Sequence, residues 1–198
     1  RNYSALPACP CARISQNPTT MKVTYLSLTH FRNYARLEQA LPDGVLILVG
    51  RNAQGKTGLL EAIYYLATAS SPHNITDRQL INWLALRENP LTYMKLVAEV
   101  RTESEIRRVD IRLELESSGV GREPRIKKSI MINGVKKRVG NLGTAVNVVL
   151  FLPQDLDLVE GSPNARRRYL DATLTQVDPL YYTALSEYTK VLQQRNAL

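Results

Sequence analysis

The chain has 198 residues, 44% of them hydrophobic, which is enough apolar material to bury the core of one domain of ordinary size. No apolar run approaches the roughly 18 residues that a membrane-crossing helix needs, so we expect a soluble protein. The formal net charge of +8 favours polyanionic partners, nucleic acid first and an anionic membrane surface second, although it is also compatible with solubility alone.

The first twenty residues differ from the rest. They contain both cysteines, Cys9 and Cys11, and show neither helical nor strand periodicity. A Cys-x-Cys pair without further Cys or His at ligand spacing points only weakly to a metal, and two thiols so close rarely form an unstrained disulfide. We interpret residues 1–20 as a disordered or artefactual leader, with the natural start at Met21 and the folded part at residues 21–198.

From Met21 the pattern becomes regular. Residues 23–31, VTYLSLTHF, alternate loosely between apolar and polar and predict a strand. Pro42-Asp43-Gly44 predicts a turn, and the apolar run Val45–Val49 predicts a strand buried on both faces. A helix is expected from about Thr57 to Ala67. Its apolar face comprises Leu59, Leu60, Ile63 and Leu66.

The middle of the chain has an antiparallel pattern. A short helix is expected from Thr76 or Asp77 through Leu84, because both residues are competent caps. Residues 93–102 and 107–116 are predicted to be strands. Residues 125–139 predict a hairpin that turns at Asn133-Gly134, a strong hairpin signal.

The last third begins with an apolar run, Ala145–Leu152, which predicts another buried strand ended by Pro153. Ser162-Pro163 is a helix-start signal for the segment ARRRYLDATL, and Asp178-Pro179 repeats it for a helix from Leu180 to about Asn196. These elements indicate an α/β fold with a mixed sheet and an antiparallel β subdomain, followed by helices.

The segment GRNAQGKT matches G-x-x-x-x-G-K-[ST] between an apolar run and an amphipathic helix, the context that a phosphate-binding loop requires. Its glycines allow backbone N–H groups to approach phosphate oxygens, the lysine reaches the β- and γ-phosphates, and the threonine hydroxyl binds Mg²⁺. The predicted nucleotide-binding residues are Gly50, Arg51, Asn52, Ala53, Gln54, Gly55, Lys56 and Thr57, with Thr57 as the Mg²⁺ ligand.

The loop does not define the class of enzyme. A small GTPase or nucleotide kinase should present an Mg²⁺-supporting Asp at the end of a second buried strand. Asp110 lies inside a half-polar strand and Asp155 follows Pro153-Gln154, too late to end the preceding run. A solvated strand position and a turn residue are therefore the favoured roles. An enzyme whose second acidic motif lies beyond residue 198 fits better.

Four segments together resemble the amino-terminal part of the RecF family, bacterial recombination mediators with an ABC-type ATPase head related to SMC proteins. They are YLSLTHFRNY, GRNAQGKTGLLEAIYYLA, FLPQDLDLVEGSPNARRRYLD and LQQRNAL. The resemblance covers Met21 to Leu198. It implies a cytoplasmic, ATP-dependent DNA-binding protein of replication and recombinational repair that binds single-stranded and gapped double-stranded DNA and assists recombinase loading.

The resemblance also implies an ATP-dependent homodimer in the full-length protein, recombination mediator proteins as partners, and no membrane. Each ATP would be sandwiched between the phosphate loop of one subunit and a signature motif of the other. The signature and Walker B motifs lie in the carboxy-terminal half of the family, so we expect this fragment not to hydrolyse ATP alone.

Carried over onto this sequence, the resemblance adds four residues. Arg32 and Asn33 of FRNY would lie near the nucleotide, with a simple surface loop as the alternative. Gln154 is a candidate for the Mg²⁺-sensing glutamine, although a helix-capping turn is favoured. His73 stands where the family is expected to have arginine, so a phosphate contact there would be weaker and pH-sensitive.

A basic hairpin is the candidate DNA contact. Residues 122–139 contain seven basic residues, Arg122 and Arg125 among them, against one acid, Glu123. Such a patch attracts phosphates with little sequence selectivity. The alternative is an edge strand protected from aggregation by lysines. No aromatic residue is interleaved, so base stacking is not indicated here. The predicted DNA-binding residues are Lys127, Lys128, Lys136, Lys137 and Arg138.

A second basic cluster is Arg166-Arg167-Arg168. Consecutive helical residues point about 100° apart, so these three cannot all face one ligand. We expect one of them to pair internally, with Asp171 as the candidate, and another to face DNA or nucleotide.

The residues themselves are therefore compatible with three functions. The first is an ATP-dependent DNA clamp in repair. The second is a non-catalytic adaptor, in which nucleotide only holds the fold. The third is a P-loop kinase or GTPase, which the missing second acidic motif disfavours.

Overall fold

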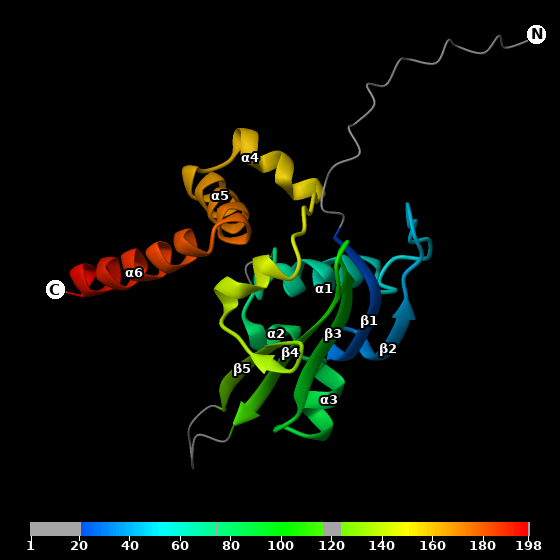
Figure 1. Cartoon of the computed structure of the whole chain (residues 1–198). Helices are drawn as coiled ribbons and strands as arrows, with labels where there is room; N and C mark the ends of the chain where they lie inside the picture. The colour runs from blue at the N-terminus through cyan, green and yellow to red at the C-terminus, as the bar shows by residue number, and fades with distance from the viewer. Residues whose placement is uncertain (1–20, 74, 117–123, 198) are drawn as a thin grey trace, which may run out of the picture.

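The computed structural model describes residues 21–73, 75–116 and 124–197 (Figure 1). The predicted leader, residues 1–20, lies outside the described residues, as do Arg122 and Glu123 of the basic hairpin. The side chain of Gln154 is also outside the description, although its backbone belongs to a 3-10 turn.

One sheet organises the described residues. Its six strands follow the order β2-β1-β3-β4-β5-β6, and every neighbouring pair is antiparallel. The strands are β1 (Lys22–Phe31), β2 (Tyr34–Ala40), β3 (Tyr93–Arg101), β4 (Ile106–Glu116), β5 (Arg125–Ile132) and β6 (Val135–Lys136). The strands predicted from residues 23–31, 93–102, 107–116 and the hairpin are confirmed.

The alternation of side chains explains which face of the sheet is buried. In β3, Leu96 and Ala98 are fully buried, whereas Lys95 and Glu99, which flank them and point to the opposite face, remain partly exposed. The buried face carries the core, which includes Leu26 and Leu28 of β1 and Leu66 of α1. Helix α1 therefore packs on this face, and the opposite face stays polar, as in other one-sided antiparallel sheets.

The helices are more numerous than predicted. They are α1 (Lys56–Thr68), α2 (Asp77–Leu80), α3 (Trp83–Glu88), η1 (Val139–Thr144), η2 (Pro153–Leu156), α4 (Asp157–Glu160), α5 (Pro163–Val177) and α6 (Pro179–Asn196). The single helix expected up to Leu84 is split, because Ile81 forms a β-bridge with Phe31. The side chain of Asn82 then caps α3 by accepting from two backbone N–H groups.

Two predicted strands are wrong. Val45–Val49 has no regular secondary structure and pairs with no described strand, and Val45 and Val49 are 92% and 89% exposed. In Ala145–Leu152 the first residues are buried, but Val149 is 91% exposed and no strand forms. The mixed sheet is therefore absent from the described part of the chain. A strand needs a hydrogen-bonded neighbour, which an apolar run cannot guarantee by itself.

The polar residues that follow β1 were not predicted to form a strand, yet Tyr34–Ala40 form β2. Helices α5 and α6 begin where predicted, with Ser162 and Asp178 as their caps. Neither has a fully buried residue in the described set, and both lie to one side of the sheet (Figure 1). Among the residues that the structure describes, no helix is long and apolar enough to cross a membrane.

Candidate nucleotide-binding site

The loop of residues 50–57 follows the Val45–Val49 segment, and its last two residues, Lys56 and Thr57, begin α1. Gly55 has φ +97° and caps the helix in a left-handed conformation. A Cβ at this position would come within 2.8 Å of the Tyr34 hydroxyl and 2.9 Å of Asn33 Nδ2. Both the backbone angle and the space therefore require glycine at Gly55.

Lys56 folds back over the loop. Its Nζ donates to the carbonyls of Gly50 and Arg51, each at 2.7 Å. Thr57, the next residue, is exposed on the first turn of α1. The amino-terminal end of this 13-residue helix thus brings together an ammonium, a hydroxyl and its positive dipole end, an arrangement that suits a phosphate.

Side chains of the β1–β2 turn donate hydrogen bonds to the backbone of the phosphate loop. Asn33 Nδ2 donates to the carbonyl of Ala53 at 3.4 Å, and the Tyr34 hydroxyl donates to the carbonyl of Gly55 at 3.1 Å. Burial raises the pKa of Tyr34, so its hydroxyl stays protonated and able to donate at neutral pH. Tyr34 was missed by sequence reasoning, which considered only Arg32 and Asn33 of this turn.

Arg32 is held by an acid rather than left free. Its Nε and one terminal nitrogen donate to the two carboxylate oxygens of Glu61, at 2.7 and 2.9 Å. Glu61 is only 3% exposed, and the hydroxyl of Ser71 donates to the same carboxylate at 2.5 Å. Arg32 itself adopts φ +52°. Glu61 was also missed, because its partners Arg32 and Ser71 are distant in sequence.

The predicted apolar face of α1 needs a related correction. Leu59 and Leu66 are buried as expected, whereas Leu60 is 41% exposed. Ala62 and Tyr65 complete the buried face instead. The helix is therefore rotated from the predicted orientation, with Glu61 on its buried side and paired with Arg32.

A cavity of about 640 Å³ opens beside the loop. It brings together loop, turn and helix residues that are distant in sequence, and it includes Arg32 and Asn33 as predicted. Gly50, Arg51 and Gln54 are not among its lining residues, although Gly50 and Arg51 hold Lys56. The lining residues are Arg32, Asn33, Asn52, Ala53, Gly55, Lys56, Thr57, Gly58, Glu61, His73, Gln79, Ile81 and Trp83.

Curated proteins are similar in sequence to this chain over most of its length. The DNA replication and repair protein RecF of Roseiflexus castenholzii is 44% identical over 182 residues, covering 90% of this chain and 46% of the relative. RecF of Herpetosiphon aurantiacus is 43% identical over 182 residues, covering 90% and 47%. The chain is homologous to RecF. It spans about half the length of the curated relatives it matches.

Solved RecF structures agree with this relationship. The recombination mediator protein RecF in the RecFOR pathway, solved as RecF-ATP, matches with a TM-score of 0.76 at 28% identity, covering 92% of this chain and 46% of that one. The RecF-ATPrS structure gives the same TM-score and identity, with 90% and 44% covered. The predicted fold class, a P-loop ATPase head of the RecF type, is thereby confirmed. No family model matches the sequence.

The basic hairpin of this RecF homologue divides into inward and outward residues. Lys128 points toward α1: its Nζ lies 2.8 Å from Asp77 Oδ2, donates to the Ala69 carbonyl at 2.7 Å and lies 5.2 Å from the Tyr65 ring centroid. It therefore has a structural role that does not suit a DNA contact. Lys127 pairs with Glu116 on the exposed face.

The remaining predicted DNA contacts, Lys136, Lys137 and Arg138, are exposed around the short strand β6. The turn between β5 and β6 is formed by Asn133 and Gly134, both with positive φ, as a type I′ hairpin requires. The hairpin itself is therefore confirmed, and its DNA contacts stay a prediction.

The arginine cluster on α5 does not form the expected pair. Arg166 donates to the carbonyls of Leu158, Val159 and Gly161 at the end of α4, and Arg167 donates to Asn164. Asp171 instead accepts a hydrogen bond from the Tyr181 hydroxyl at 2.5 Å. The predicted arginine pairing of Asp171 is therefore wrong, because the following helix offers a closer donor.

The two candidate acids for a second motif have structural partners. Asp110, on the outer face of the sheet, pairs with Lys95 at 3.1 Å. Asp155 accepts from the backbone N–H of Leu152 at 2.6 Å and so closes a turn. Neither lines the cavity at the phosphate loop.

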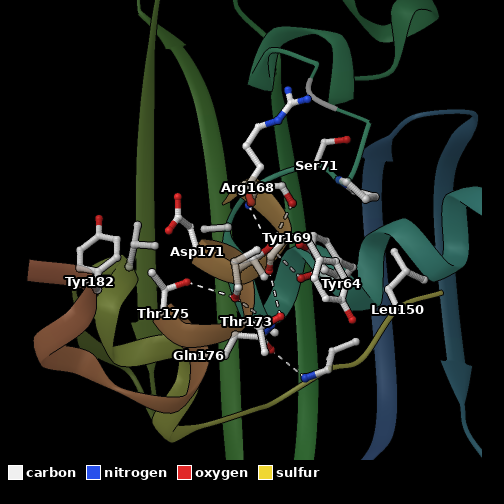
Figure 2. A pocket seen from close by; sticks show the side chains of 18 of the residues that line it. Tyr64, Ser71, Leu150, Arg168, Tyr169, Asp171, Thr173, Thr175, Gln176 and Tyr182 are labelled. Atoms are coloured by element: carbon white, nitrogen blue, oxygen red, sulfur yellow. Dashed lines mark hydrogen bonds between the residues drawn. The ribbon is translucent and has the colours of Figure 1, made fainter. Parts of the chain in front are cut away.

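A larger cavity of about 1050 Å³ lies between the end of α1 and helices α5 and α6 (Figure 2). Its lining includes Tyr64, Arg168 and Tyr169, and Figure 2 shows Arg168 extending away from Asp171. Burial, followed by the charge of Asp155, raises the pKa of Tyr64. None of the predicted nucleotide-binding residues lines this cavity, whereas several of them line the smaller one.

Proposed function

We propose that the chain binds ATP with Mg²⁺ through residues 50–57, as part of a RecF-type ATPase of DNA repair. The observation that carries this proposal is the position of Lys56, whose ammonium lies against the Gly50 and Arg51 carbonyls at the mouth of the loop. A bound phosphate would take the place of these two carbonyls as the hydrogen-bond partner of the Lys56 ammonium. The cavity beside the loop falls within the size range of small-ligand sites.

Thr57 is the chain's proposed ligand for Mg²⁺. Its exposed hydroxyl follows Lys56 at the start of α1, where hard oxygen ligands suit this ion. Mg²⁺ held there would neutralise part of the negative charge of the triphosphate. Asn33 and Tyr34 hold the loop by hydrogen bonds to its backbone carbonyls, and Arg32 lines the same cavity with its charge paired to Glu61.

The proposed DNA contact is the outward part of the basic hairpin, Lys136, Lys137 and Arg138, with Lys127 beside it. All four are exposed, and such residues bind the phosphate backbone with little sequence preference. Gapped double-stranded and single-stranded DNA are the proposed substrates. A nucleotide-dependent dimer, mediator partners and assisted recombinase loading are further proposals, supported by the description of RecF relatives as recombination mediator and DNA repair proteins.

The test is binding of fluorescently labelled gapped DNA with ATP, with ADP and without nucleotide, for the wild type and Lys56→Ala. The proposal predicts tighter binding with ATP, and predicts that Lys56→Ala abolishes this difference while leaving basal binding intact. Equal affinity in all three conditions would contradict a nucleotide-controlled clamp and favour an adaptor whose nucleotide only supports the fold.

A further inference from the structure

Trp83 is an exposed aromatic residue in the wall of the nucleotide cavity. It is the only tryptophan in the chain, and 58% of its surface is exposed although the residue is large and apolar. It lines the same cavity as Lys56 and Thr57. Exposure of one apolar side chain is ordinary in a folded protein, so its location in this cavity is what matters.

The backbone of Trp83 is fixed to the turn that supports the loop. The preceding residue, Asn82, is 3% exposed, and its side-chain nitrogen donates to the Arg32 carbonyl at 2.7 Å. In the opposite direction, the Arg32 N–H donates to the Leu80 carbonyl at 2.7 Å. The residues just before Trp83 are therefore anchored to the turn that contains Arg32 and Asn33, by one hydrogen bond to Arg32 and one from it.

The indole ring is restrained as well. Arg87, one helical turn later, places its guanidinium carbon 5.7 Å from the ring centroid, within the range of a cation–π contact. A restrained aromatic surface in a cavity loses little conformational freedom when a flat ligand stacks on it.

We propose that Trp83 contacts the base of the bound nucleoside triphosphate by stacking, in the same cavity as the phosphate-binding groups. This inference rests on the proposed nucleotide binding and adds the residue that recognises the base. Stacking on an aromatic ring is available to every base, so Trp83 would strengthen binding of nucleotides over inorganic phosphates more than it would distinguish among bases.

The experiment compares binding of MgATP and magnesium tripolyphosphate, which has no base, by isothermal titration calorimetry. The variants are Trp83→Ala, Trp83→Phe and, as the matched control, Leu84→Ala, because Leu84 is half exposed on the same helix but does not line the cavity. Circular dichroism and thermal melting verify that each variant is folded. Lys56→Ala tests the phosphate end separately.

We expect Trp83→Ala to weaken ATP binding roughly 5- to 150-fold, the range for loss of one stacking contact, and to leave tripolyphosphate binding unchanged. Trp83→Phe should restore most of the ATP affinity, and Leu84→Ala should behave as wild type. Addition of ATP should also change the fluorescence of the single tryptophan in the wild type.

Two results would overturn the inference while leaving nucleotide binding intact. One is wild-type ATP affinity in Trp83→Ala, which would make this residue a contact for a macromolecule or an inert surface residue. The other is equal weakening of ATP and tripolyphosphate, which would mean that Trp83 supports the loop. If the wild-type chain binds neither compound, the proposed function itself fails.

Discussion

Arg32 and Glu61 form a two-point ion pair at the edge of the nucleotide cavity, with nitrogen to oxygen distances of 2.7 and 2.9 Å. The pair connects the β1–β2 turn to the helix that follows the phosphate loop. Because Glu61 is 3% exposed, its charge depends on Arg32 and on the hydroxyl of Ser71 for compensation.

Removing Arg32 should therefore destabilise the fold. We expect Arg32→Ala to lower the free energy of unfolding by about 3 kcal/mol, since the carboxylate of Glu61 would stay buried without its cation. Urea denaturation measures the change. Arg36→Ala is the matched control, because Arg36 pairs with Glu38 on an exposed part of the neighbouring strand. An unchanged stability in Arg32→Ala, equal to that of the control, would contradict a structural role for the pair.

A methyl group at Gly55 should disrupt the phosphate loop. In Gly55→Ala the new Cβ would meet Tyr34 and Asn33 in addition to the strain of φ +97°. Gly134→Ala is a close control, because Gly134 has φ +77° but no atom within 4 Å of the added carbon. We expect both variants to lose about 1 kcal/mol of stability from backbone strain. Only Gly55→Ala should also lose ATP binding in a calorimetric titration, and retained binding would contradict the tight fit of the loop.

The two adjacent hairpin lysines should respond differently to substitution. Lys128→Ala removes the contacts to Asp77, Ala69 and the Tyr65 ring, and should cost about 2 kcal/mol of unfolding free energy without a specific effect on DNA. Lys127→Ala removes an exposed pair with Glu116 and should leave stability unchanged.

In DNA-binding assays at several salt concentrations, Lys136→Ala and Lys137→Ala should each weaken binding and reduce the salt slope by about 1. Their stability should match the wild type. If Lys128→Ala proved to be the variant with the largest loss of DNA affinity at intact stability, the division into inward and outward lysines would be wrong.

Tyr65 should make stability depend on pH in the alkaline range. Its burial, together with the nearby charge of Asp77 and a hydrogen bond to that carboxylate at 2.8 Å, raises the pKa of Tyr65 far above its usual value. The unfolded chain releases the phenolic proton near pH 10, whereas the folded chain keeps it. The stabilising contribution is therefore complete below pH 10 and is lost as the pH rises above 10.

Tyr65→Phe tests this linkage. At pH 8 the variant should be less stable than the wild type by roughly 2 kcal/mol, because the hydrogen bond to Asp77 is lost. Above pH 10 the difference should shrink by up to about 1.4 kcal/mol per pH unit, since only the wild type has this tyrosine to ionise on unfolding. A difference that stays constant from pH 8 to pH 11 would contradict a raised pKa at Tyr65.

The sequence correctly predicted the turns and helix starts that are determined by residues close together in the chain. The hairpin turn at Asn133-Gly134 and the helix starts at Ser162-Pro163 and Asp178-Pro179 are set by backbone angles and caps within a few residues. The phosphate loop is of the same kind, because its glycine, lysine and threonine are contiguous. These features could be predicted without knowing the tertiary structure.

Features that depend on a distant partner were missed or wrong. Val45–Val49 has the apolar character of a buried strand, but the described residues provide no neighbour to pair with it. Glu61 and Asn82 both hydrogen-bond to Arg32, which is far from either residue in the chain. Asp171 accepts a hydrogen bond from Tyr181 of the next helix rather than from an arginine of its own helix. In each case tertiary contact decided between residues with similar local propensity.

The central claim is that residues 50–57 bind the triphosphate of ATP with Lys56 and Mg²⁺, and calorimetric titration of the chain with MgATP tests it most directly. We predict saturable binding at one site, severe weakening in Lys56→Ala, and in Thr57→Ala a loss of the tighter binding that Mg²⁺ confers. Undiminished MgATP binding by Lys56→Ala, or no binding by the wild type, would contradict the account.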